Sequence, residues 1–323
     1  MKKVLIVLIW VFISSAFSAR AQNYQGLWHG YITEYDFQIT SGYILQVKEH
    51  KGNIISGRAY IYSKKYFVFQ GILDFIGTID KLNSKVTELV IVKSEMPTDM
   101  AYLCIKFLNL TFQKKAGKEI LTGKWNGYSE NSECRPGEVY LQRYIFDNPT
   151  QSDPIPEPLL SMITGDSTTK MSFLNTDLTP PLILDVKRTF LEFEITDYLR
   201  NDNDTVSVYF NRRPIISNLQ IRNKPFRKTL RLDKLSGLNE VIIYAENLGG
   251  VPPNTCVLTV YDGVRRQSVN IFSSKQVSAV IYLNYNPNTH QPVYNNSDNF
   301  FKDELKKAED GPVIEKRPKE IKY

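Results

Sequence analysis

The sequence is poor in the residues on which most catalytic sites depend. Its 323 residues contain only three histidines and three cysteines, and no histidines have the spacing of a metal-ligand pair. A nucleophile elbow, a P-loop and a dinucleotide-binding glycine pattern are also missing. Two carboxylates can act together from distant points of a chain, so glycoside hydrolysis stays open. These absences favour a non-enzymatic protein.

Charge of one sign and long apolar runs are scarce as well. Without the cations of Lys2, Lys3 and Arg20, the formal charge falls from +6 to +3, which is too weak a field to favour nucleic acid. The one long apolar run, residues 4–17, follows the two lysines and precedes Ala19-Arg20-Ala21. It predicts a signal peptide at 1–21, because it is shorter than the ~20 residues of a membrane-spanning helix. We expect export to the periplasm or cell envelope, with an extracellular location as the alternative. No transmembrane segment is expected after cleavage.

The three cysteines have different surroundings. In an oxidising compartment, Cys104 and Cys134 can form a disulfide if the strand register brings them within bridging distance. Cys256 alternates with core-facing positions, which predicts a small buried hydrophobic residue.

Residues 22–145 consist of short runs in which apolar and polar residues alternate. A period of two is typical of strands, and about eight strands suffice to close a small antiparallel barrel. Two Gly-x-Trp-x-Gly patterns, around Trp28 and Trp125, would bring one large ring inward on each strand. We expect the two indoles to be neighbours at one end. The predicted strands are Trp28–Thr33, Tyr43–Val47, Ile54–Tyr62, Phe67–Leu73, Glu88–Val92, Ala101–Leu110, Ile120–Tyr128 and Glu138–Arg143.

Residues 146–181 are rich in proline, which opposes both helix interiors and sheets. They predict an extended linker, with a Leu159–Ile163 patch that docks onto one domain. Residues 285–323 predict a charged, mostly disordered tail.

Residues 182–284 predict a second β-domain. The stretch 239–262 carries two alternating runs around Gly249-Gly250 and Pro252-Pro253, a pattern typical of two strands joined by a structured loop. Turn signals at intervals of about ten residues favour an immunoglobulin-like sandwich of two antiparallel sheets. The predicted strands are Leu182–Asp185, Thr189–Ile195, Thr205–Phe210, Ile215–Ile221, Arg227–Leu232, Glu240–Glu246, Thr255–Tyr261, Ser268–Phe272 and Val277–Leu283.

Two segments resemble known families. The tryptophan-bearing first strand and the run from Cys134 to Leu141 resemble the lipocalin-like barrels of secreted Bacteroidetes proteins. The run 204–211, together with the stretch 239–262, is similar to a β-domain of Bacteroidetes envelope proteins. In some of those it precedes an OmpA-type peptidoglycan-binding region, which this sequence lacks. The resemblance implies an all-β envelope protein and names no ligand.

Aromatic rings in the first domain are candidates for ligand contact. Rings inside a barrel bind apolar molecules, whereas rings stacked on a sheet bind sugars. Core packing explains most of them equally well. The candidate ligand-binding residues are Trp28, Trp125, Tyr60 and Tyr62.

A basic run in the second domain is a candidate for an anionic partner, although charged side chains on a solvated face also explain it. Its members are Arg212, Arg213, Arg222, Lys224, Arg227, Lys228 and Arg231.

A group of aspartates is a candidate calcium site. Asp197, Asp202 and Asp204 offer hard oxygen ligands, but the glycine and last acid of an EF-hand loop are missing. An ordinary turn also favours these residues. Calcium is the only cofactor that the sequence suggests.

We therefore expect a secreted binding protein that recognises an envelope protein or glycan. Two alternatives remain open: a carrier of a small apolar ligand in the barrel, and a hydrolase with carboxylates at a barrel mouth.

Overall fold

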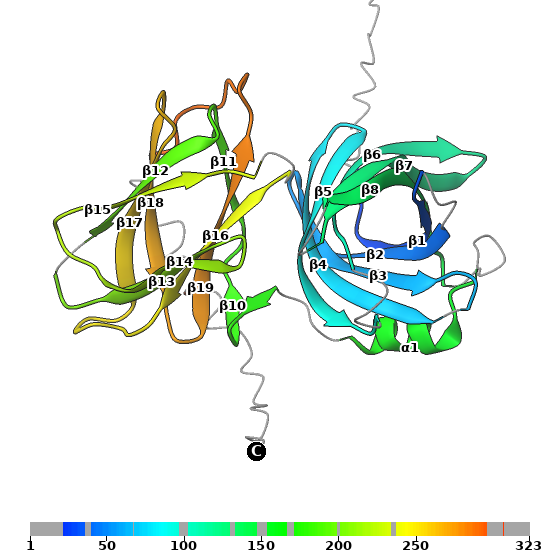
Figure 1. Ribbon diagram of the computed structural model, residues 1–323, viewed down its shortest axis with the longest axis horizontal. Helices are drawn as coiled ribbons and strands as arrows, with labels where there is room; N and C mark the ends of the chain where they lie inside the picture. The colour runs from blue at the N-terminus through cyan, green and yellow to red at the C-terminus, as the bar shows by residue number, and fades with distance from the viewer. Residues whose placement is uncertain are drawn as a thin grey trace, which may run out of the picture.

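The computed structural model of the chain is built from β-strands and, in the part that it describes, one short helix (Figure 1). It describes residues 22–35, 40–66, 68–96, 103–129, 133–146, 154–166, 171–198, 201–233, 237–295 and 306. The predicted signal peptide and most of the predicted charged tail lie outside these residues.

Eight antiparallel strands close into a barrel in the N-terminal part of the chain. Strands β1 and β8 close it, with Trp28 opposite Arg143 at one end of the pairing and Ile32 opposite Val139 at the other. The predicted barrel is therefore confirmed. Its strands are β1 (Gly26–Thr33), β2 (Thr40–Lys51), β3 (Ile54–Ser63), β4 (Phe69–Asp80), β5 (Asn83–Ser94), β6 (Ile105–Lys115), β7 (Lys118–Tyr128) and β8 (Glu133–Arg143).

Side chains of the barrel's own strands pack its interior. Tyr43, Phe75 and Leu141 are fully buried there in one core cluster, which also contains both predicted indoles. Close strand approach requires glycine at the tryptophan strands, because a Cβ at Gly30 would overlap the carbonyl oxygen of Tyr140. The glycines of the Gly-x-Trp-x-Gly pattern thus let neighbouring strands approach closely.

Two sheets pack face to face in the C-terminal part and share a second core. A seven-stranded sheet has the order β14-β13-β16-β19-β10-β9 with β11 on β19, and a four-stranded sheet has the order β15-β12-β17-β18. Cys256 is buried in this core as expected. Unlike the prediction, β10 and β11 run parallel to β19.

The strands of the sandwich follow the predicted ranges, with two additions before them. They are β9 (Ser172–Phe173), β10 (Thr176–Leu178), β11 (Leu182–Val186), β12 (Phe190–Asp197), β13 (Thr205–Phe210), β14 (Arg213–Gln220), β15 (Phe226–Arg231), β16 (Asn239–Ala245), β17 (Asn254–Tyr261), β18 (Arg266–Ser273) and β19 (Val277–Tyr285). The all-β class predicted from the sequence is confirmed.

The proline-rich segment differs from the predicted extended linker. Helix α1 (Glu157–Gly165) begins after Pro156, and Pro158 lies in its first turn, where a missing N–H costs no helical hydrogen bond. Leu159 and Ile163, one turn apart, are buried against the outside of the barrel, as expected for this patch. Strands β9 and β10 then join the sandwich. The segment therefore packs on both domains.

The start of the predicted tail is also ordered. Its chain runs beside β18, where the Ser268 N–H donates to the carbonyl of Tyr294. The guanidinium of Arg265 donates to the carbonyls of Gln291 and Pro292. The sandwich therefore extends beyond its predicted end at residue 284.

Barrel and sandwich contact one another through an apolar cluster. Ile76 of β4 packs with Ile242 of β16 and with Val280 and Tyr282 of β19, on the outer face of the seven-stranded sheet. These side chains are almost completely buried. This contact explains why β16 and β19 are apolar on both faces, one toward the sandwich core and the other toward the barrel.

Candidate functional site

The two predicted indoles lie toward opposite ends of the barrel. The Trp28 indole N–H donates to the carbonyl of Tyr24, just before β1, whereas that of Trp125 donates to the carbonyl of Thr33, at the end of β1. Strands β1 and β7 run in the same direction because both pair antiparallel with β8. Trp28 is near the start of its strand and Trp125 near the end, so the prediction that they are neighbours is wrong.

Tyr60 and Tyr62 lie on the outside of the barrel in the cluster beneath α1, and both rings are buried. The Tyr60 hydroxyl is 2.9 Å from Gln46 Oε1 and 3.1 Å from Asp166 Oδ2. The Tyr62 hydroxyl lies 2.8 Å from Nε2 of His29. Both rings are buried in this cluster, which favours packing over contact with a ligand from solution. The ligand role of Tyr60 and Tyr62 remains a prediction from the sequence.

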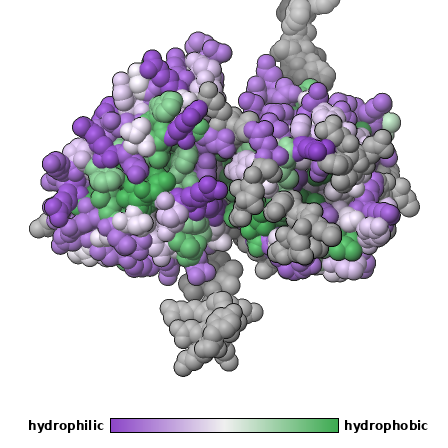
Figure 2. Space-filling model, viewed as in Figure 1, coloured by the Kyte–Doolittle hydropathy of each residue, from purple (hydrophilic) through white to green (hydrophobic). Residues whose placement is uncertain are grey.

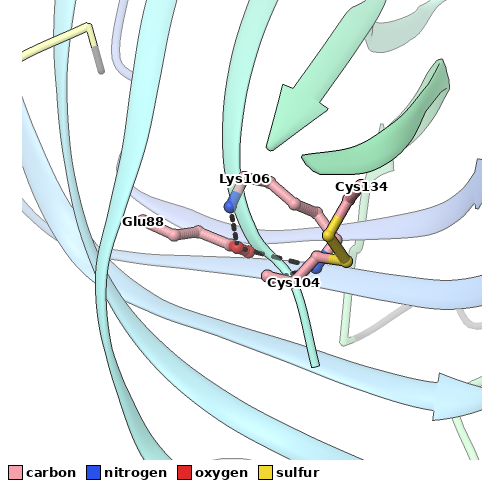
Figure 3. The surroundings of a disulfide bond; sticks show 4 residues. All are labelled: Glu88, Cys104, Lys106 and Cys134. Carbon is pink, nitrogen blue, oxygen red and sulfur yellow. Dashed lines mark hydrogen bonds and ion pairs between the residues drawn. A yellow bond between two sulfur atoms is a disulfide. The ribbon is translucent and has the colours of Figure 1, made fainter. Parts of the chain in front are cut away.

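A disulfide joins Cys104 and Cys134 near one end of the barrel, with Cα atoms 6.3 Å apart. Figure 3 shows Glu88 of β5 and Lys106 of β6 beside this disulfide, with the lysine side chain directed at the carboxylate. The strand register that joins the cysteines thus also brings a buried acid and a buried base together.

The carboxylate of Glu88 is completely engaged. It accepts a 2.6 Å hydrogen bond from the Tyr43 hydroxyl and a 2.7 Å bond from the Lys106 backbone N–H, and the Lys106 ammonium lies 3.6 Å away. The ammonium donates to the carbonyl of Cys104 and lies over the ring of Trp125. Burial raises the pKa of Glu88 and lowers that of Lys106, while their mutual attraction opposes both shifts. This arrangement favours a structural pair over a catalytic carboxylate at a barrel mouth.

The predicted basic patch is divided by the fold. Arg212 pairs with buried Glu240 at the domain interface, so it does not belong to a surface patch. Arg227 pairs with Glu194 on the outer face of the four-stranded sheet. The exposed members are Arg213, Arg222, Lys224, Arg227, Lys228 and Arg231.

The predicted calcium ligands meet in part. Asp202 and Asp204 lie together at one end of the sandwich, and Asp197 is near enough to raise the pKa of Asp204. Burial, followed by the nearby charges of Asp202 and Asp197, raises the pKa of Asp204 to about 6 despite a hydrogen bond from the Thr255 N–H. Within the part of the chain that the structure describes, no three His, Cys, Asp or Glu side chains form a metal-holding group.

An open groove lies at the other end of the sandwich and is the strongest candidate for a binding site. Its volume is about 480 Å³, and its walls come from the turn between β11 and β12, the turn after β17 and the end of β19. Asp262 joins two of these segments, because its carboxylate accepts hydrogen bonds from the backbone N–H groups of Lys187 and Arg265. Sequence reasoning missed this groove, although Arg231 of the predicted patch lies beside it.

Exposed aromatic rings surround this groove. Phe190 is 61% exposed, Tyr261 38% and Tyr285 39%. Lys187 and Arg188 bring positive charge from the turn before β12, and Glu192 and Asp262 of the same lining bring negative charge. The Asp262 carboxylate is already engaged by backbone N–H groups. Figure 2 shows one face of the whole protein, on which hydrophobic residues gather over the sandwich between hydrophilic margins. The surface of the sandwich is therefore not uniformly polar. Flat rings beside cations can contact both the apolar face and the acidic groups of a ligand.

One more cation lies beside the groove. The guanidinium of Arg231 is 5.3 Å from the centre of the Phe190 ring, so the strand β15 contributes charge next to the most exposed of the three groove rings.

Comparison of the chain with protein-family models, curated proteins and solved structures finds no match. Among the described residues, no helix is long and apolar enough to span a membrane.

Proposed function

We propose that this chain is an exported, non-enzymatic binding protein of the cell envelope that recognises an acidic glycan in the groove of the sandwich. The observation that carries the proposal is the meeting of three exposed aromatic rings with Lys187 and Arg188 around one groove. Sugar rings stack on aromatic side chains, and lysine and arginine pair with carboxylate or phosphate groups. The signal-peptide pattern and the resemblance to Bacteroidetes envelope domains support the location.

The carrier and hydrolase alternatives have less support. The barrel interior is packed with its own rings, and Tyr43 and Phe75 are fully buried there. The acid at the end of the barrel, Glu88, is already engaged by a lysine and a tyrosine. The groove, by contrast, offers exposed rings and cations to a ligand from solution.

Direct binding measurements test the proposal. Immobilised envelope polysaccharide and lipopolysaccharide are offered to the full mature chain and to the variants Phe190→Ala and Arg188→Ala. We expect each variant to bind more weakly by about threefold to tenfold, since an aromatic contact contributes roughly 0.5–1.5 kcal/mol. Binding of the wild-type chain should weaken as salt is added, because charge pairs at a surface are screened.

Two surface variants serve as matched controls. Tyr66→Ala removes a ring that is 67% exposed on the barrel, and Lys224→Ala removes an exposed cation away from the groove residues. Both should bind the glycan like the wild-type chain. Equal losses in control and groove variants, or binding that resists salt and every groove substitution, would show that the groove is not the site.

A further inference from the structure

A second potential site lies at the other end of the sandwich, formed by the loop before β13 and the loop between β16 and β17. Asp204 immediately precedes β13 and is completely buried. Its Oδ2 accepts a 2.7 Å hydrogen bond from the Thr255 N–H, but its Oδ1 is buried with no hydrogen-bond partner among the described residues. An unpaired carboxylate oxygen in the interior is costly unless a charge or donor compensates it.

Asp202 shows the same asymmetry. Its Oδ2 accepts a 2.8 Å hydrogen bond from the Val251 N–H, and its backbone carbonyl accepts one from Gly250. Its Oδ1 is buried and, in the described part of the chain, accepts no hydrogen bond. Two acidic side chains thus each direct one oxygen to the backbone and keep the other oxygen available.

Both carboxylates lie beside Gly249. A Cβ at this position would lie 2.5 Å from Asp204 Oδ1 and 2.8 Å from both carboxylate oxygens of Asp202. Gly249 has a φ of +55°, and its lack of a side chain lets both carboxylates approach its backbone closely. Any other residue would clash with these oxygens, of which Asp204 Oδ1 and Asp202 Oδ1 have no hydrogen-bond partner among the described residues.

A further oxygen is available at this end of the sandwich. The amide nitrogen of Asn254 donates to the carbonyls of Thr205 and Asn247, which fixes the orientation of its amide. Its Oδ1 is buried and accepts no hydrogen bond within the described residues. Carboxylate and amide oxygens are the ligands that Ca²⁺ prefers, and this ion completes a shell of six to eight oxygens with carbonyls or water.

From this geometry we infer that the chain binds one Ca²⁺ ion between Asp202 and Asp204, beside Gly249. The ion neutralises two carboxylates that otherwise face each other in a buried place. It also joins the loop before β13 to the loop between β16 and β17, both of which are turns of the sandwich. This site is separate from the groove, since β12 runs from Phe190 at the groove to Asp197 at the aspartate end, roughly 20 Å at the usual rise of a strand.

Calorimetric titration of the chelator-treated mature chain with CaCl₂ tests this inference. We expect one Ca²⁺ per chain, with a dissociation constant of about 1 mM or tighter, the range of extracellular calcium modules. The melting temperature should rise with added Ca²⁺ and fall again with EDTA, because an ion that binds only the folded state stabilises it. Absence of binding at millimolar Ca²⁺, or Mg²⁺ binding as tightly as Ca²⁺, would overturn the inference.

The variants Asp202→Asn and Asp204→Asn keep the shape of each side chain and remove its charge. Each should weaken Ca²⁺ binding at least about tenfold while the far-ultraviolet circular dichroism spectrum stays that of a β-protein. Asp80→Asn, an exposed acid at a barrel hairpin, is the matched control and should bind Ca²⁺ like the wild-type chain. If both site variants bind Ca²⁺ as tightly as this control, the assignment is wrong. A melting temperature that rises on acidification but not with Ca²⁺ would instead indicate a proton shared by the two carboxylates.

Discussion

At the scale of single residues, the barrel core contains one charged pair among large apolar side chains. Glu88 and Lys106 are almost completely buried, and the lysine also lies over the rings of Tyr43 and Trp125. Transferring two charges from water is expensive, so the contacts around this pair compensate a cost that an apolar pair would not incur. The pair joins β5 to β6 beside the disulfide.

Removing one member of this pair tests its importance. Lys106→Met leaves the Glu88 carboxylate buried without its cation, and we expect the free energy of unfolding to fall by about 3–5 kcal/mol. Urea denaturation followed by indole fluorescence measures the change, since Trp125 lies beside the lysine. The matched control is Lys93→Met, whose ammonium pairs with Glu95 near the surface and should cost less than about 1 kcal/mol. Equal losses in the two variants would contradict the buried role.

At the scale of elements, α1 is held on the barrel by both apolar and ionic contacts. Leu159 and Ile163 pack on the outer face of the barrel, and Asp166 follows the last turn of the helix. The Asp166 carboxylate lies 2.7 Å from the Lys48 ammonium and 2.7 Å from the Arg58 guanidinium. Leu160 and Met162 also pack, partly buried, against this cluster. Apolar packing is not directional, so we infer that the ion pairs of Asp166 fix the position of the end of the helix.

The variant Asp166→Ala should loosen this helix. It removes the acceptor shared by two cations and the Tyr60 hydroxyl, and we expect a loss of about 1–3 kcal/mol in unfolding free energy. Amide hydrogen exchange over residues 157–165 should become faster, while the barrel strands keep their protection. Glu157→Ala, at the exposed start of the same helix, provides the comparison. Unchanged exchange in α1 after loss of Asp166 would mean that apolar packing alone holds it.

At the scale of the whole molecule, a buried ion pair of the sandwich lies near the apolar cluster at which sandwich and barrel meet. The carboxylate of Glu240 on β16 is fully buried, pairs with Arg212 and accepts a 3.0 Å hydrogen bond from the Tyr282 hydroxyl. Burial raises the pKa of Glu240 against the opposing effect of Arg212, and Asp74 of the barrel adds to the increase. The pair thus lies close enough to the barrel for Asp74 to act on it. From the buried apolar contact beside it we infer that barrel and sandwich are held together as one unit.

Substitution of the arginine tests this coupling. Arg212→Ala leaves the buried Glu240 carboxylate without its cation, and we expect a loss of about 3–5 kcal/mol together with a larger radius of gyration by X-ray scattering. Arg213→Ala is the control, because its neighbouring side chain is exposed. Two domains that melt separately in the Arg212 variant and together in the control would support the rigid unit. Identical scattering curves and melting profiles for both variants would argue against it.

The strands of this protein follow from the sequence because a period of two is a local property. Each predicted strand has a counterpart among β1–β8 and β11–β19, and turns such as Lys51-Gly52-Asn53 and Asp262-Gly263 lie where they were expected. The helix α1 was not predicted, because proline density was interpreted as opposition to all regular structure. Proline is tolerated in the first helical turn, and that is where Pro158 lies.

Sequence alone determined the class of fold and a buried environment for Cys256, because these depend on local alternation of polarity. Only the tertiary structure decided which end of the barrel each indole occupies and which face Tyr60 and Tyr62 present. It also decided that three exposed rings meet in one groove. Those features depend on strand direction, register and the pairing of distant segments, which no local pattern encodes. The acids at 202 and 204 show the same division: their residue types suggest a cation, but only folding directs their free oxygens toward Gly249.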